Sequence, residues 1–121
     1  MLVIDDEEPL VRLVEEWLAE LGYEPIGFTR SRDALDELRA NLLRFDAVVV
    51  DESMPGLTGT CVAGEIHRLR PDVPILLVSG FSGPELAGRA RSAGITGLLR
   101  KPLRRRELAL ALARALQLQE A

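Results

Sequence analysis

The chain has 121 residues, of which 47% are hydrophobic and 28% are charged, so it can form one substantial core and lacks the composition of a disordered segment. Its net charge of -4 argues against a surface devoted to nucleic acid, and its single cysteine, Cys61, excludes an internal disulfide. No apolar run reaches membrane-spanning length and no signal peptide is recognisable, so we expect a soluble, cytoplasmic protein without membrane contact.

The first quarter of the chain predicts two strands separated by a helix. Residues 2–5 form a short buried strand, and the helix that follows begins at Pro9 and is capped by Gly22. Residues 24–28 form the second strand. The proline within it has no N–H to donate, so we expect this strand at an edge of the sheet.

The middle of the chain continues the alternation. Ser31 is placed to cap a second helix. Residues 47–51 form a third strand that is β-branched and apolar on both faces, which is typical of a central strand in a parallel sheet. A third helix is predicted between Gly59 and Leu69, and the proline at position 71 helps to end it.

The last part of the chain predicts two further strands and two helices. Residues 73–79 and 95–100 are the strands, Pro84 begins a weak helix rich in small residues, and residues 104–118 form the final helix. Five strands alternating with five helices predict one α/β domain over residues 1–121. We expect a flavodoxin-like, doubly wound, five-stranded parallel sheet in the order 2-1-3-4-5.

Polar residues stand where the central predicted strands end. The first strand ends in Asp5 and Asp6, the third in Asp51, and the fourth and fifth lead to Ser79 and Lys101. The first and third strands are neighbours in this order, so three carboxylates should meet, and at an effective dielectric near 20 two of them about 4 Å apart repel by roughly 4 kcal/mol. Either a raised pKa or a bound cation such as Mg²⁺ relieves this. With the ammonium and the hydroxyl added, these are the groups that an aspartyl nucleophile needs to accept a phosphoryl group.

Four motifs at these strand ends resemble those of a known family. They are VIDDE, VVVDESMPG, ILLVSG and LLRKP, in the right order and at the right separations. The chain resembles the CheY-like receiver domain of two-component signalling over essentially its whole length. The resemblance implies that Asp51 accepts a phosphoryl group from a phosphohistidine, assisted by Ser79 and Lys101. The implied magnesium ligands are Asp5, Asp6, Asp51 and the backbone carbonyl of Ser53.

The resemblance also implies partners and a mode of signalling. The partners are a histidine kinase or a histidine phosphotransfer domain and adjacent domains of the same chain, with no direct contact to nucleic acid. Receivers commonly carry Tyr or Phe three residues before the lysine, where this chain has Leu98, so we expect signalling through a shift of residues 80–98. A cis peptide bond is implied before Pro102.

The abrupt start of the chain and the lack of an output segment lead us to expect a receiver that is part of a longer protein. The stretches ILLVSGF and LLRKPL resemble receivers at the C-terminal ends of hybrid histidine kinases. A stand-alone single-domain regulator is the alternative. Whether the chain is an enzyme beyond its own phosphorylation and dephosphorylation stays open.

The sequence lacks features that three other functions would require or includes features that they would not need. An aspartyl-nucleophile phosphatase needs a general acid two residues after the nucleophile, where this chain has Ser53, and a substrate cap. A flavin-binding domain of this fold needs a phosphate loop rich in Ser, Thr and Gly, where this chain has DDEEP. A degenerate receiver that only binds proteins would not need the complete set of acidic residues that this chain has, Asp5, Asp6 and Asp51, so their presence argues against this function.

Other polar groups are expected to be structural. His67 should be an ordinary exposed or half-buried helix residue, and Cys61 a small packing residue. Glu7 and Glu8 should be capping charges. Residues 104–106 are three arginines that should form a solvated first turn, although a partner surface stays open because they oppose the helix dipole.

Overall fold

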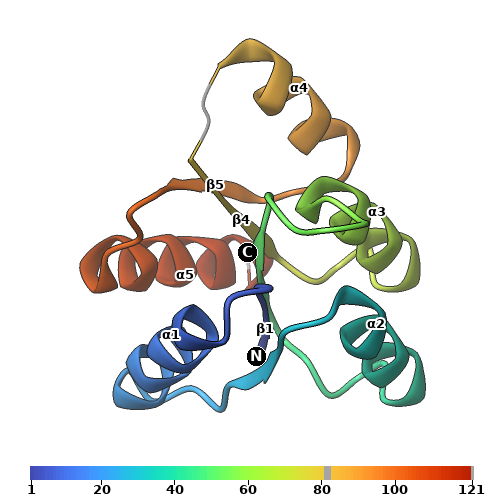
Figure 1. Ribbon diagram of the computed structural model, residues 1–121. Coiled ribbons are helices and arrows are strands. Elements are labelled where there is room, and N and C mark those ends of the chain that lie inside the picture. The colour runs from blue at the N-terminus through green and yellow to red at the C-terminus, as the bar shows by residue number, and fades with distance from the viewer. Residues whose placement is uncertain (81–82, 121) are drawn as a thin grey trace.

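The structure is a computed structural model that describes residues 1–80 and 83–120 (Figure 1). The strands are β1 (Leu2–Ile4), β2 (Ile26–Phe28), β3 (Val48–Asp51), β4 (Ile75–Ser79) and β5 (Gly97–Arg100). The helices are α1 (Glu8–Glu20), α2 (Ser31–Ala40), α3 (Gly59–Leu69), α4 (Pro84–Ser92) and α5 (Arg105–Glu120).

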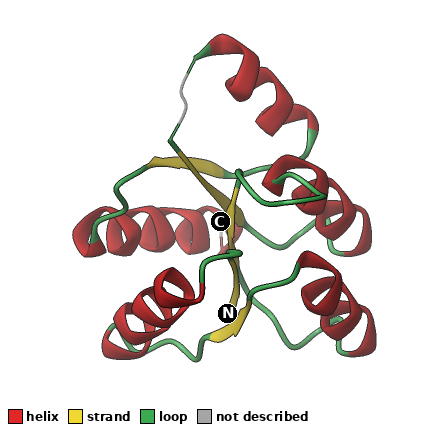
Figure 2. Cartoon of the chain, in the orientation of Figure 1, coloured by secondary structure: helices red, strands yellow, loops and turns green. Residues whose placement is uncertain are grey.

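The five strands form one parallel sheet in the order β2-β1-β3-β4-β5, which confirms the predicted flavodoxin-like topology. Helices α1 and α5 cover one face of this sheet and α2 and α3 cover the other, while α4 lies beyond the β4 and β5 side (Figures 1 and 2). Because helices lie on both faces, the sheet is enclosed on both sides.

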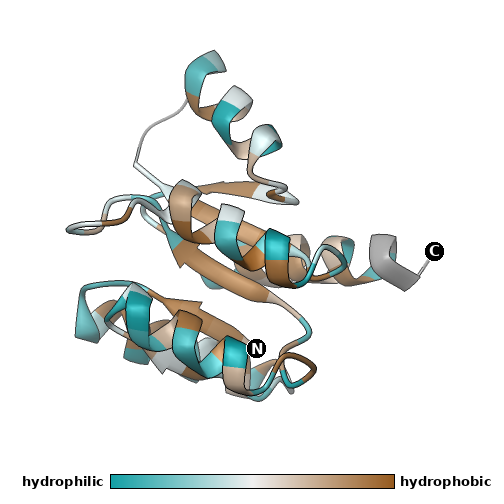
Figure 3. Ribbon diagram, turned by 90° about the vertical axis from the view of Figure 1, so that its right-hand side faces the viewer, coloured by the Kyte–Doolittle hydropathy of each residue, from teal (hydrophilic) through white to brown (hydrophobic). Residues whose placement is uncertain are grey.

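The core consists of two clusters, one on each face of the sheet. Successive strand residues point to opposite faces, so Val48 and Val50 pack with α2 and α3 whereas Val49 packs with α1 and α5. Figure 3 shows the consequence: the strands are hydrophobic along their length, and the helices carry hydrophilic stretches. The sheet is therefore the rigid, buried support on which the strand ends are positioned.

The predicted element types are confirmed, but several ends differ. β1 stops at Ile4, which leaves Asp5 just beyond the strand, and β2 begins at Ile26, after the proline. β2 is nevertheless an edge strand, as predicted. The predicted cap at Ser31 is wrong: α2 begins at this residue, and its hydroxyl instead donates to the sulfur of Met54, 3.8 Å away.

The structure also tests the predictions for Cys61 and His67. Cys61 is exposed, so the prediction that it packs in the interior is wrong. His67 is half-buried, as expected, and its ring packs against Gly94, where an added Cβ would lie 2.4 Å from the imidazole. Among the described residues, no helix combines the length and the apolar character needed to cross a bilayer.

Candidate functional site

The carboxyl ends of β1, β3, β4 and β5 bring the polar residues to one edge of the sheet. Asp51 is the last residue of β3 and pairs in register with Val78, so β4 reaches one residue further and ends at Ser79. Ser79 pairs with Arg100, and Lys101 follows directly. The parallel register therefore aligns the nucleophile candidate, the hydroxyl and the ammonium within one row of strand ends.

Three carboxylates meet at this edge. Asp5, Asp6 and Asp51 each offer one oxygen, and these three oxygens lie within 4.8 Å of one another. Asp51 is 3% exposed, Asp5 is partly exposed and Asp6 is exposed. The Glu7 backbone N–H donates to Asp5 Oδ1 at 3.0 Å, which fixes the orientation of that carboxylate. A cluster of hard oxygen donors that is open on one side fits Mg²⁺ with several retained waters.

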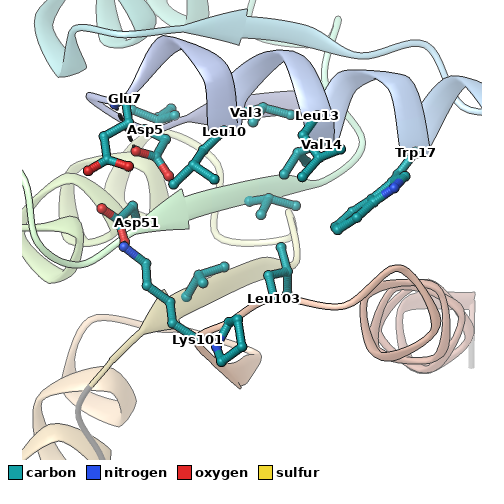
Figure 4. A pocket seen from close by; sticks show the side chains of 14 residues that line it. Val3, Asp5, Glu7, Leu10, Leu13, Val14, Trp17, Asp51, Lys101 and Leu103 are labelled. Carbon is teal, nitrogen blue, oxygen red and sulfur yellow. Dashed lines mark hydrogen bonds and ion pairs between the residues drawn. The ribbon is translucent and has the colours of Figure 1, made fainter.

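Lys101 closes the site from the side of β5. Its Nζ atom forms an ion pair with Asp51 Oδ1 at 2.7 Å, and Figure 4 shows the extended lysine side chain reaching Asp51 opposite Asp5 and Glu7. Burial alone would lower the pKa of Lys101, but the hydrogen bond and the charge of Asp51 outweigh it and raise that pKa above its usual value. The ammonium is therefore a fixed positive charge beside the nucleophile candidate.

Burial disfavours the ionised form of two of these carboxylates. Burial raises the pKa of Asp5 to about 6, partly countered by the Glu7 N–H, and the charge of Asp51 adds to the rise. Burial also raises the pKa of Asp51, against the lowering effect of Lys101. Both shifts show that the site disfavours its own negative charge, so a bound cation would relieve a cost that the fold already carries.

The structure places the two serines differently. Ser79 is buried at the end of β4, and its backbone carbonyl accepts a hydrogen bond from the Lys101 N–H at 2.9 Å. Ser53 is exposed in the loop after β3, two residues beyond Asp51. The expected cis bond between Lys101 and Pro102 is present. The roles of both serines stay predictions.

The loop between β3 and α3 is folded tightly back onto the end of β3. Gly59 donates its N–H to the carbonyl of Glu52 at 3.0 Å, and a Cβ added at Gly59 would lie 2.2 Å from the backbone oxygen of Asp51. Thr58 caps α3 by accepting the N–H of Cys61 at 3.2 Å. Only glycine permits this approach, so position 59 helps to fix the backbone that carries Asp51.

Sequence reasoning missed Glu52, the residue that follows Asp51. Its side chain is buried, and Oε1 accepts hydrogen bonds from both the N–H and the hydroxyl of Thr60, each at 2.7 Å. Oε2 forms an ion pair with Arg89 of α4 at 3.5 Å. The only signal in the sequence was strand alternation, which directs residue 52 away from the side of Asp51. Glu52 therefore ties the site to α3 and α4.

Sequence reasoning also missed a groove of about 620 Å³ that includes Asp51 and Lys101. It runs between α1 and the segment after β5, and Figure 4 shows the charged residues at one end and Trp17 at the other. Its apolar wall on α1 consists of Leu10, Leu13, Val14 and Trp17. The helical spacing of these residues predicted an apolar face but not that part of it stays uncovered.

Comparison with known proteins gives a consistent result. The family model described as "Response regulator receiver domain" matches residues 1–113. The transcriptional regulatory protein PdtaR of Mycobacterium tuberculosis is 37% identical over 102 residues, which are 84% of this chain and 49% of that protein. The two-component response regulator ARR12 of Arabidopsis thaliana is 30% identical over 108 residues, which are 89% of this chain and 18% of that protein. The chain thus spans half or less of these two relatives.

Solved structures agree with the fold. A response regulator receiver domain protein from Clostridium thermocellum superposes with a TM-score of 0.91 at 28% identity, covering 98% of this chain and 94% of that one. The likeness therefore extends along nearly the whole of both chains.

Proposed function

Because the chain belongs to the family of response regulator receiver domains, we propose that Asp51 is the phosphoacceptor of a two-component pathway. The donor is a phosphohistidine on a histidine kinase or a histidine phosphotransfer domain. The observation that carries this proposal is the 2.7 Å contact between the Lys101 ammonium and the buried Asp51 carboxylate, with the Asp5 and Asp6 carboxylates beside it.

In the proposed reaction, an oxygen of Asp51 forms a bond to phosphorus while the bond between phosphorus and the histidine nitrogen breaks. The electron pair of the broken bond stays on the imidazole nitrogen, so Asp51 becomes an acyl phosphate. In the later dephosphorylation, water attacks phosphorus, the Asp51 oxygen leaves with its electron pair, and inorganic phosphate is released. Both steps depend mostly on positioning and on neutralising charge.

The residues around Asp51 provide that neutralisation. Lys101 already forms an ion pair with Asp51, and its ammonium can contact the phosphoryl oxygens once Asp51 is phosphorylated. Ser79 supplies a hydroxyl donor at the end of the neighbouring strand β4. Asp5, Asp6 and Asp51, with the backbone carbonyl of Ser53, would hold Mg²⁺, which when bound supplies positive charge to the phosphoryl oxygens. Rigid strands keep these groups in place before the donor arrives.

Signalling proceeds through a shift of residues 80–98, of which 81–82 lie outside the described residues. Weak packing of α4 supports this: its buried residues are Leu86 and Ala90, and its main helix contact is with α3. Gly83, at its start, has φ of +133°, a conformation that other residues rarely adopt. Helices with few buried contacts belong to the low-stability part of a fold and move at low cost.

The longer protein to which this chain would belong is a second proposal. We infer a hybrid sensor histidine kinase from the likeness of two strand motifs alone, and the stand-alone regulator is the alternative. The curated relatives reported above are named as response or transcriptional regulators. The open reading frame around this chain decides the matter: a kinase region in the same frame supports the hybrid, and a frame that encodes no kinase region on either side of these residues contradicts it.

The phosphoacceptor proposal has a direct test. Purified chain is incubated with Mg²⁺ and acetyl phosphate, and the intact protein mass is followed with time, together with binding of beryllofluoride. We expect modification and binding in wild type, none without Mg²⁺, and none in Asp51→Asn. Equal modification of the Asp51→Asn variant would overturn the proposal.

A further inference from the structure

Glu7 lies beside the phosphoacceptor site and has no part in the function proposed above. It occupies the N-cap position of α1, but its side chain makes no capping hydrogen bond. Glu7 lines the groove together with Asp5, Asp51 and Lys101, and Figure 4 shows its carboxylate next to that of Asp5 and directed toward Asp51. The expectation that Glu7 is a capping charge therefore accounts for its position but not for the direction of its side chain.

The backbone of Glu7 is held on both sides, although its side chain is exposed. Its N–H donates to Asp5 Oδ1 at 3.0 Å, and its carbonyl oxygen accepts the N–H groups of Leu10 and Val11 at 3.0 and 3.1 Å. The carboxylate thus extends from a fixed point at the carboxyl edge of the sheet. The next residue, Glu8, instead pairs with Arg12 at 2.5 Å and is not among the residues that line the groove.

The charge of Glu7 reaches the reacting groups. Burial is the largest cause that raises the pKa of Asp51, and the charge of Glu7 adds to the rise. Burial lowers the pKa of Lys101, but nearby acids that include Asp51 and Glu7 outweigh this effect and raise it. A charged group that enters between Asp51 and Lys101 therefore experiences the field of Glu7 as well.

Glu7 also changes the charge balance of the site. The carboxylates of Asp5, Asp6 and Asp51 bring three negative charges, and Lys101 with one bound Mg²⁺ would bring as many positive ones. Glu7 then leaves the site with an excess negative charge. Because every phosphodonor has to enter this field, the charge that the donor carries affects how readily it reaches Asp51.

We propose that Glu7 determines donor specificity, by favouring phosphodonors whose leaving group is a protonated nitrogen over acyl phosphates. This inference rests on the proposed function of Asp51. In phosphoramidate, as in phosphohistidine, the phosphoryl group is bonded to nitrogen, and the protonated nitrogen of phosphoramidate offsets part of the phosphoryl charge. The acyl group of acetyl phosphate is neutral, so Glu7 repels the full charge of its phosphoryl group.

Both reactions balance without a further reactant. With phosphoramidate, an Asp51 oxygen forms a bond to phosphorus while the bond between phosphorus and nitrogen breaks. The electron pair stays on nitrogen, which leaves as ammonia with the protons that it already carries. With acetyl phosphate, the bond between phosphorus and the acyl oxygen breaks, and acetate leaves with the electron pair. Glu7 forms no bond in either reaction and acts only through its charge.

The kinetic test compares kcat/KM for phosphoramidate and acetyl phosphate at saturating Mg²⁺ and low salt. In Glu7→Gln we expect the ratio of phosphoramidate to acetyl phosphate to fall about threefold, mainly because acetyl phosphate reacts faster. Glu7→Asp, which keeps the charge, should keep most of the wild-type preference. High salt should narrow the difference between wild type and Glu7→Gln, because it screens exposed charges.

Glu8→Gln is the matched control, since it makes the same change at the next residue, which does not line the groove. It should keep the wild-type ratio of the two donors. An equal fall of the ratio in Glu8→Gln and Glu7→Gln would contradict a specific role for Glu7.

Mg²⁺ binding provides a readout without phosphoryl transfer. The charge of Glu7 attracts a cation, so Glu7→Gln should raise the Kd for Mg²⁺ about threefold in isothermal titration calorimetry, while Glu8→Gln leaves it nearly unchanged. The two expected effects of Glu7→Gln have opposite directions, because the cation binds more weakly and the dianionic donor reacts faster. Loss of local structure would instead impair both.

The outcomes separate the two proposals. Modification by both donors with the same ratio in wild type and Glu7→Gln overturns the role of Glu7 and leaves Asp51 as phosphoacceptor. Equal slowing of both donors in Glu7→Gln also overturns it, since the residue would then be structural. No modification by either donor overturns the proposed function and this inference with it.

Discussion

Arg89 of α4 forms an ion pair with Glu52, the residue that directly follows Asp51 in the chain. The arginine is exposed, while the glutamate is buried and is also held by two hydrogen bonds from Thr60. A helix with few buried residues is thus connected by one charged contact to the first residue after β3, the strand that carries the phosphoacceptor candidate. This contact is a point at which a change at Asp51 can reach α4.

Replacing Arg89 with Ala should loosen α4 without unfolding the protein. An exposed arginine contributes about 0–1 kcal/mol through such a pair, so the free energy of unfolding in urea should change by no more than that. Amide hydrogen exchange in α4 should become several-fold faster, while exchange in β3 stays the same. Arg91→Ala is the matched control, because Arg91 forms no ion pair within the described part of the chain. Equal acceleration in both variants would contradict a specific role for the pair.

Gly59→Ala should damage the site through the backbone. The new Cβ would lie 2.2 Å from the Asp51 carbonyl oxygen and 2.8 Å from its carbon, and backbone atoms cannot move aside cheaply. We expect a loss of about 2–4 kcal/mol in the free energy of unfolding. Gly64→Ala on the same helix meets no atom within 4 Å and should instead stabilise by about 0.5–1 kcal/mol. Denaturation in urea measures both, and similar values for the two variants would contradict the close approach at Gly59.

The raised pKa of Asp5 predicts the pH dependence of stability in the metal-free protein. The pKa of Asp5 is about 6 in the folded state and has its ordinary value of 3.8 in the unfolded state, so between these values the folded state binds more protons. The contribution of Asp5 to the free energy of unfolding is therefore full below pH 4 and is lost as the pH rises to about 6. Asp5→Asn has no carboxyl group at this position and does not undergo that loss. Between pH 4 and pH 7, the free energy of unfolding of Asp5→Asn should therefore rise relative to that of wild type by on the order of 1 kcal/mol, after allowance for solvent screening of this half-exposed group.

Urea denaturation in EDTA at pH 4 and pH 7 checks this difference. Added Mg²⁺ should stabilise wild type more than Asp5→Asn at pH 7, since the ion offsets the cost of the buried negative charge of Asp5 and its repulsion by Asp51. A stability difference between the two proteins that is identical at both pH values would show that Asp5 does not carry the dependence.

Lys101→Met should strengthen Mg²⁺ binding while it slows phosphorylation. The ammonium lies 2.7 Å from Asp51 Oδ1, so it competes with a cation for the Asp51 carboxylate and repels that cation. Its removal should lower the Kd for Mg²⁺ roughly tenfold, as one neighbouring charge is worth about 1–3 kcal/mol at a partly exposed site. Isothermal titration calorimetry measures the Kd. Arg100→Met, which removes an exposed cation one residue earlier, should leave it nearly unchanged; weaker binding in Lys101→Met would contradict the repulsion.

The fold and the acidic cluster could be predicted because they follow from periodic patterns. A proline in a short apolar segment indicated the edge strand β2, and the valines of residues 48–50 indicated the central β3. Once the strand order was known, parallel strands required their ends to meet at one edge. The carboxylates of Asp5, Asp6 and Asp51 were therefore placed together before any side chain was seen.

The features that could not be predicted depend on tertiary contacts that no periodic pattern in the sequence indicates. Burial of Glu52 results from a loop that returns to β3 at Gly59, and nothing in the stretch DESMPG indicates that return. Serine is a residue type that favours the N-cap position, but Ser31 is the first residue of α2, and Arg30 occupies the N-cap position. The spacing of Trp17 marks it as apolar, and spacing cannot tell whether the neighbouring helix covers it.

The exposed thiol at position 61 makes the chain convenient for spectroscopy. It is the only cysteine, and it lies on α3 in the depression that α3 shares with Gly88 and Arg89 of α4. A nitroxide spin label or a maleimide dye can thus be attached at one defined position without any substitution. The mobility of that label would follow α4 directly, so displacement of the helix can be timed in the unaltered protein.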